Sequence, residues 1–160
     1  MQDKGKKYEL FCTALDSLDR GTALINAYDA LLHDYGGVVL FQAESQMIKA
    51  IGSHPGITAA ELTDLFEKTA SACSQLIRKL KAKGWVVQER NPDNSREYHL
   101  FLTDDGKTIF EKLRAFEENC YQRTFEMLAS VTEEELQAYI RVQALLNKAF
   151  AMDVQESRTI

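Results

Sequence analysis

The feature that most restricts the fold lies between residues 58 and 102, where two short helical segments precede a strand-like alternation. The sequence TAAE at 58–61 is a capping box that opens the first helix, and Thr69 is an N-cap candidate for the second. Because only Glu67 and Lys68 separate the two segments, they are predicted to form a helix-turn-helix. The second helix is expected to bury four side chains at helical spacing: Cys73, Leu76, Ile77 and Leu80.

The strand-like segment follows this second helix directly. Gly84 can end the helix in a left-handed conformation, and the apolar side chains of 98–102 then recur at every second position. The turn-forming sequence NPDNS interrupts 85–102, which predicts a β-hairpin. A helix-turn-helix followed by a hairpin is a winged helix, so 42–103 is predicted to be a winged-helix core.

Long helices are predicted on both sides of this core. Apolar residues at helical spacing predict a helix over 7–35, ending at Gly36-Gly37, and two further helices over 104–129 and 133–150. Thr103 is the N-cap candidate of the first of these two, and TEEE at 132–135 is a capping box that opens the second. The polar tail over 153–160 is expected to be loose. The predicted fold class is therefore mainly α with a small β-hairpin wing, in a single domain of 160 residues. These helices carry more apolar surface than one small winged helix can cover, so a homodimer is expected, with 7–35 and 104–150 as dimerisation helices.

Positive charge is concentrated on one segment of an acidic chain. The chain has 19 Lys and Arg against 24 Asp and Glu, giving a net charge of −5. Residues 68–90 nevertheless contain six Lys or Arg and a single acid, Glu89. A local basic patch inside an acidic protein indicates a polyanionic partner that meets one face.

A helical wheel separates the side chains of the second helix. Its outer face carries small polar groups with Arg78 behind them, which suits insertion into a DNA major groove. Lys79 and Lys81 flank this face and are better placed for phosphates, whereas Lys83 leans toward the buried side. Arg90 and the wing tip suit a minor groove or its flanking phosphates. The candidate DNA-binding residues are Thr58, Thr69, Ser71, Ser74, Gln75, Arg78, Lys79, Lys81, Arg90, Asn94 and Arg96.

Residues 54–107 resemble the DNA-binding core of the multiple-antibiotic-resistance-regulator (MarR) family. The resemblance is carried by short motifs that recur in that family: PGIT at 55–58, EL at 61–62, KGWV at 83–86, Arg96, and LT at 102–103 with Gly106. It implies a homodimer that binds a palindromic site, with Ser71, Ser74, Gln75 and Arg78 as readers and Arg96 as the wing arginine. The chain departs from many members at Asn94, where they have Asp.

The resemblance also implies a cleft for a small phenolic or lipophilic effector, unless the same aromatic residues simply pack in the core. The residues that could line it are Tyr28, His33, Tyr35, Phe41 and Trp85. One branch of the family senses hydroperoxides through a cysteine of the first helix, where this chain has Cys12 with Tyr8 one turn away. Asp16 at the next turn does not favour a thiolate, so packing is the preferred role of Cys12.

Other classes of function find little support in the sequence. The three cysteines and three histidines are scattered, which argues against a disulfide framework or a metal site, and no cofactor is expected. No signal peptide and no apolar run of about 20 residues is present, so the protein is expected in the cytoplasm without a membrane partner. The enzyme motifs GxSxG and HExxH are absent as well. The sequence predicts a ligand-released repressor of transcription, with a winged helix for protein–protein contact or a redox-sensing regulator as alternatives.

Overall fold

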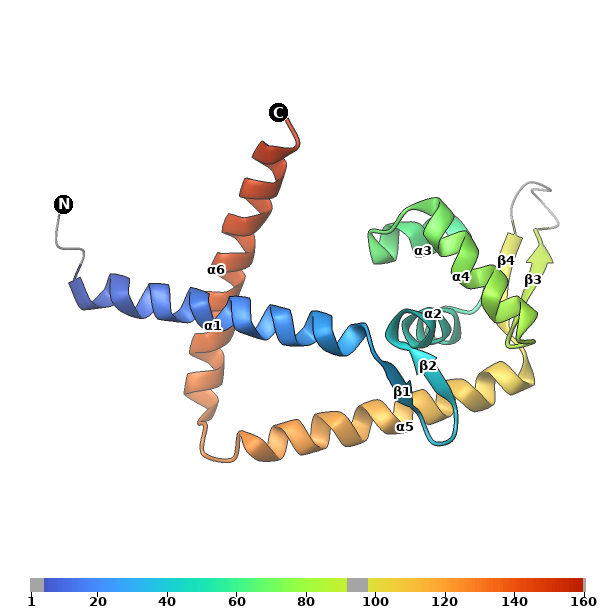
Figure 1. Cartoon of the computed structure of the whole chain (residues 1–160), viewed down its shortest axis with the longest axis horizontal. Helices are drawn as coiled ribbons and strands as arrows, with labels where there is room; N and C mark the ends of the chain where they lie inside the picture. The colour runs from blue at the N-terminus through green and yellow to red at the C-terminus, as the bar shows by residue number, and fades with distance from the viewer. Residues whose placement is uncertain (1–4, 92–97, 160) are drawn as a thin grey trace. The chain divides into compact units, whose positions relative to one another are not determined.

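The computed structural model describes residues 5–91 and 98–159. Within these residues the chain forms six helices and two antiparallel two-stranded sheets (Figure 1). The elements are α1 (Gly5–Asp29), β1 (Leu32–Asp34), β2 (Val39–Phe41), α2 (Gln42–Ser53), α3 (Ala59–Phe66), α4 (Ala70–Ala82), β3 (Val86–Arg90), β4 (Tyr98–Leu102), α5 (Asp104–Met127) and α6 (Glu133–Ser157). The predicted class, mainly α with a hairpin wing after a helix-turn-helix and with helices on either side, is confirmed.

The chain divides into two compact units, residues 1–117 and 118–160. The first unit contains the winged helix and its core. In it, α2 contacts α4, β2 and β4, so a single helix organises the helix-turn-helix and the hairpin. The side chains buried completely in this core include Leu40, Met47, Ile48, Ile51, Leu62, Cys73, Leu80 and Leu100. The second unit contains the end of α5 and the whole of α6.

The predicted caps of the helix-turn-helix are confirmed. The Glu61 carboxylate accepts a hydrogen bond from the backbone N–H of Thr58 (2.8 Å), and the Thr58 hydroxyl accepts one from the N–H of Glu61 (3.2 Å). The Thr58 hydroxyl also donates to the Glu61 carboxylate (2.8 Å). The bonds from the Thr58 N–H and hydroxyl to this carboxylate lower the pKa of Glu61, because they stabilise its ionised form. The Thr69 hydroxyl accepts from the N–H of Ala72 (3.2 Å), and Gly84 after α4 has a φ of +76°. Local sequence signals thus set both ends of α4.

The helix predicted over 7–35 is shorter in the structure. It ends at Asp29, and the following residues form β1, which pairs with β2. Gly36 and Gly37 have φ values of +71° and +87°, and the N–H of Tyr35 donates to the carbonyl of Val38 (2.9 Å). The two glycines therefore make a tight hairpin turn rather than a simple helix end.

The last helix is longer than predicted. Residues 153–157, expected to be loose, continue α6 as far as Ser157, so the helix also extends beyond the predicted limit of 150. No glycine or proline interrupts 133–157, and polarity alone does not end a helix. The predicted capping box of Thr132 and Glu135 is confirmed, and α5 ends at Met127, two residues before the predicted 129. None of the helices in the described part of the chain has the length and apolar character needed to span a membrane.

Candidate nucleic-acid interface

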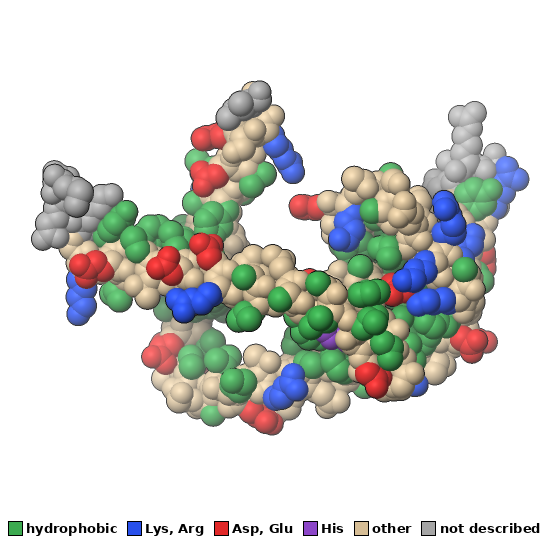
Figure 2. Space-filling view, in the orientation of Figure 1, with side chains coloured by type: hydrophobic (Ala, Val, Ile, Leu, Met, Phe, Trp, Pro, Cys, Tyr) green, Lys and Arg blue, Asp and Glu red, His purple; other side chains and the backbone are tan. Residues whose placement is uncertain are grey.

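The outer face of α4 is built as the helical wheel predicts. Cys73, Ile77 and Leu80 are buried in the core, with Cys73 in a packing role and its thiol completely covered. Four side chains point to the exposed side of the helix: Ser71, Ser74, Gln75 and Arg78. Within residues 5–91 and 98–159 these four make no side-chain hydrogen bond or ion pair, so their polar groups are available to a partner. Figure 2 shows Lys and Arg side chains gathered on this side of the winged helix.

The lysines of α4 divide into two kinds. Lys81 donates to the Oε1 atom of Gln88 on β3 (2.7 Å), a neutral partner, so its positive charge stays uncompensated at the surface. Lys79 and Lys83 instead lie 3.3 and 2.7 Å from the Oε1 atom of Glu44 on α2. The predicted inward direction of Lys83 is confirmed. Glu44 was not expected from the sequence, because its partners follow some 35 to 39 residues later.

The end of α4 is fastened to the base of the hairpin through the LT-x-x-G segment. Thr103 donates from its backbone N–H to the carbonyl of Trp85 (3.0 Å) and from its hydroxyl to the carbonyl of Gly84 (2.7 Å). The same hydroxyl accepts from the N–H of Gly106 (3.0 Å), which confirms Thr103 as the cap of α5. One threonine therefore joins α4, the hairpin and α5.

The PGIT segment adds a third, short partner to the hairpin. The N–H of Gly56 donates to the carbonyl of Leu100 (2.9 Å), and the N–H of Leu100 donates to the carbonyl of Ile57 (3.0 Å). Gly56 has a φ of +90°, which explains the glycine of this motif. Thr58 pairs with His99, so the start of α3 is attached to the wing. This pairing could not be predicted from the sequence, because three residues are too few for an alternation pattern.

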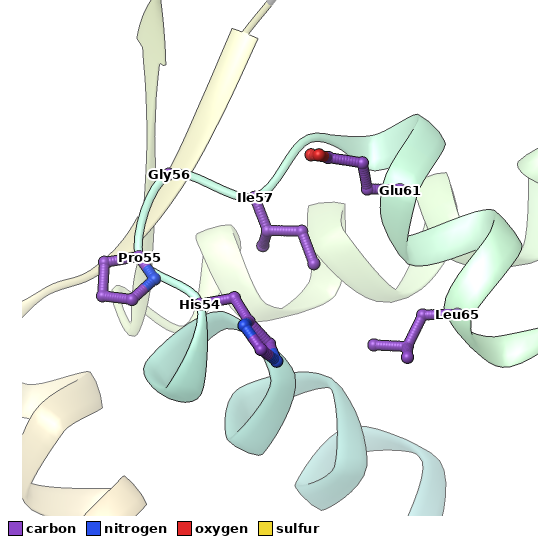
Figure 3. A pocket seen from close by; sticks show the side chains of 6 residues that line it. All are labelled: His54, Pro55, Gly56, Ile57, Glu61 and Leu65. Carbon is purple, nitrogen blue, oxygen red and sulfur yellow. The ribbon is translucent and has the colours of Figure 1, made fainter.

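An open pocket of about 410 Å³ lies beside this segment (Figure 3). Figure 3 shows the His54 and Leu65 side chains on either side of it, below Ile57, while Glu61 serves the cap of α3. The lining residues are His54, Pro55, Gly56, Ile57, Glu61 and Leu65. None of the residues predicted for an effector cleft is among them.

The structure brings together three of the five predicted effector residues. The rings of Tyr28 and His33 stack with centroids 3.9 Å apart, and Tyr35 lies edge-on to His33 at 6.0 Å. Phe116, which is not among the five predicted residues, extends this row, with its ring centroid 4.8 Å from that of Tyr35. Tyr35 is buried and donates from its hydroxyl to Gln42 (2.8 Å), so it also serves the core.

The other two predicted effector residues contact the α4 lysines instead. The Phe41 ring lies 5.7 Å from the Lys79 ammonium group, and the Trp85 ring lies 4.6 Å from that of Lys83. The five aromatic residues therefore form two groups, one at the β1–β2 hairpin and one along α4.

The remaining predicted positions are on the wing and on α1. Arg90 is exposed at the end of β3, opposite Tyr98, whereas Asn94 and Arg96 lie outside the described residues. Cys12 is partly exposed on α1. Among residues 5–91 and 98–159, no cluster of three His, Cys, Asp or Glu side chains could hold a metal ion.

Comparison with known proteins points in the same direction as this geometry. Residues 42–97 match the sequence profile of the MarR family. The HTH-type transcriptional repressor MdtR of Bacillus subtilis (strain 168) is 24% identical over 115 residues, which cover 72% of each chain. The family comprises transcriptional regulators rather than enzymes.

Solved structures with the same fold cover most of the chain. FabT of Streptococcus pneumoniae, in complex with DNA, aligns over 92% of this chain and 99% of its own, with a TM-score of 0.67 and 19% identity. Zinc-responsive ZitR of Lactococcus lactis aligns over 88% and 99%, with a TM-score of 0.72 and 15% identity. PcaV of Streptomyces coelicolor, in complex with its natural ligand, aligns over 85% and 90%, with a TM-score of 0.59 and 16% identity.

Proposed function

Because the chain is a winged helix-turn-helix, DNA-binding transcriptional regulator of the MarR family, we propose that it acts as a homodimeric repressor on a palindromic operator. The observation that carries this proposal is the outer face of α4. It presents two serines, Gln75 and Arg78 to solvent without internal partners among the described residues. Small polar groups can approach base edges closely, and Gln and Arg can each make bidentate contacts there.

The contacts to DNA are assigned by chemistry. Ser71, Ser74, Gln75 and Arg78 face the major groove, while Thr58 and Thr69 stand at the helix starts that approach the backbone. Lys81 keeps its charge at the surface and contacts phosphate. Arg90, together with Asn94 and Arg96 of the wing, contacts the adjacent minor groove or its phosphates.

Dimerisation is supported by apolar surface that the single chain leaves exposed. In the described residues, neither α1 nor α6 has a buried side chain. The large apolar side chains that these two helices expose include Leu10, Leu24, Ile25, Tyr139, Ile140 and Leu145. A second copy of the chain offers the same surfaces and covers them symmetrically, and two winged helices then match a palindrome.

Release by a small effector is the last part of the proposal. The aromatic row of Tyr28, His33, Tyr35 and Phe116 offers stacking surface to an aromatic or lipophilic molecule. Tyr35 in this row contacts Gln42 of α2 and Phe116 of α5. A molecule bound there could shift α2, which packs against α4 and β4 of the winged helix. A structure of the related PcaV contains that protein's natural ligand.

The proposal is tested by selecting bound fragments from random duplex DNA with the full-length protein. We expect an enriched palindrome, with affinity that falls steeply as salt rises, because phosphate contacts release counterions. A selection that enriches no sequence, combined with binding that ignores salt, would instead favour a winged helix that contacts an acidic protein.

The roles of Gln75 and Lys81 are separable on the selected operator. Gln75→Ala should reduce discrimination against a changed base pair by about 1–3 kcal/mol. Lys81→Ala should weaken operator and random duplex alike and flatten the dependence of log affinity on log salt by about one unit per bound protomer. Titrations of both duplexes at several salt concentrations measure these effects. If both variants change the two duplexes in the same way, the assignment of roles is wrong.

A further inference from the structure

A buried carboxylate lies behind the DNA-reading face of α4. Glu44, in the first turn of α2, is 2% exposed. Its Oε2 atom accepts a hydrogen bond from the backbone N–H of Phe41 (3.2 Å). Its Oε1 atom accepts one from the Nζ atom of Lys83 (2.7 Å) and lies 3.3 Å from the Nζ atom of Lys79. One buried negative charge on α2 therefore faces two positive charges near the end of α4.

The carboxylate is held in its charged form. Burial alone would raise the pKa of Glu44, but the hydrogen bonds from Lys83, from the Phe41 N–H and from Lys79 together outweigh burial and lower it. Glu44 is consequently ionised at neutral pH. The two lysine side chains retain 49% and 32% exposure, and each ammonium group also lies near an aromatic ring, Phe41 or Trp85.

We infer that Glu44 is a positioning residue that holds Lys79 and Lys83 against α2 and so withholds their charge from DNA phosphates. This inference rests on the proposed DNA-binding function. It reassigns Lys79, a candidate phosphate contact, as a lysine engaged within the protein. Arg78 and Lys81 then remain the cations that α4 offers to DNA.

The arrangement affects the sequence-independent attraction of the protein for DNA. A lysine that contacts phosphate strengthens binding to every duplex alike and carries no sequence information. A lysine that Glu44 neutralises does not add to this general attraction. The affinity for random DNA is therefore lower than the number of positive charges on α4 suggests.

The test is Glu44→Gln in the full-length protein. Glutamine keeps an acceptor for the Phe41 N–H but removes the charge that holds the lysines. On a random duplex, log affinity should fall more steeply with log salt, by about 0.9 per bound protomer for one additional phosphate contact. A fourfold dilution of salt should then strengthen random binding about 3.5-fold more per bound protomer than in the original protein, which is about 12-fold for a bound dimer. Preference for the operator should stay unchanged, because a released lysine strengthens binding to both duplexes alike.

Glu117→Gln is the matched control. Glu117 pairs with Lys49 at 2.8 Å, so this variant also removes a carboxylate from a lysine and changes the net charge equally, but away from α4. Its salt dependence should equal that of the original protein. In the triple variant Glu44→Gln/Lys79→Gln/Lys83→Gln the slope should return to the original value, because both released cations are gone.

The possible results distinguish a failure of the inference about Glu44 from a failure of the proposed DNA-binding function. Equal slopes for Glu44→Gln and Glu117→Gln would overturn the inference. So would a Glu44→Gln variant that weakens both duplexes without a change in slope, since a purely structural role acts in that way. An original protein that binds no duplex at any salt concentration contradicts the proposed function itself.

A second measurement does not depend on whether Glu44→Gln folds. In the original protein, trace acylation of lysine amines is followed by mass spectrometry with and without random duplex DNA. We expect DNA to protect Lys81 and to leave the acylation of Lys79 and Lys83 unchanged. Equal protection of all three lysines would place Lys79 and Lys83 on the phosphates and refute the inference.

Discussion

Gly106→Ala should destabilise the protein by about 3 kcal/mol, which corresponds to a decrease in melting temperature of about 6–12 °C for a chain of this length. Gly106 is buried at the start of α5, and a Cβ atom there would overlap the backbone carbonyl oxygen of Trp85. That carbonyl accepts the N–H of Thr103, so it cannot move aside without losing a hydrogen bond at the hairpin base. Thermal denaturation followed by circular dichroism measures the effect.

Gly21→Ala is the comparison for this substitution. Gly21 lies within α1, and a Cβ atom built there meets no atom within 4 Å in the described chain. Alanine is the better helix former, so this variant should be as stable as the original protein or more stable by up to about 1 kcal/mol. If Gly106→Ala were equally well tolerated, the close contact with Trp85 would not be what requires glycine in the LT-x-x-G motif.

Local signals explain what the sequence could predict. The capping residues Thr58, Thr69 and Thr132 act within three residues of their partners, and the structure contains all three caps. Helical periodicity likewise identified the buried side of α4, because four apolar residues at regular spacing define one face. Caps and buried faces that depend on residues within one or two helical turns can therefore be predicted from the sequence alone.

Contacts between residues far apart in the sequence could not be predicted in this way. The β1–β2 hairpin exists because Gly36 and Gly37 turn the chain back on itself, and a pair of glycines signals a helix end equally well. In the sequence Glu44 is an ordinary residue near the start of a helix. Only the packing of α2 on α4 gives it two lysine partners. For the same reason the wheel could place Lys79 beside the exposed face but could not detect the carboxylate that engages it.

The position of Tyr35 decides where a truncation that tests the proposed dimer should begin. A chain that starts at residue 36 would lose Tyr35, which is buried, contacts Phe116 and donates to Gln42. Such a chain could lose the dimer because its core no longer folds, and not because α1 is missing. A chain that starts at residue 30 removes α1 and leaves β1 and Tyr35 in place, so it separates assembly from folding.

Removal of residues 1–29 should abolish the proposed dimer and weaken operator binding by about 10²–10⁴-fold. The reason is that two linked winged helices bind the second half-site as an intramolecular event, whereas separate monomers must bind each half-site independently. Analytical ultracentrifugation measures the assembly, and titration of the palindrome and of a single half-site measures the binding. Affinity for the half-site should change little, because α3, α4 and the hairpin remain. A truncated chain that stays dimeric, or that binds the palindrome as tightly as the full chain, would show that α1 does not hold the two copies together.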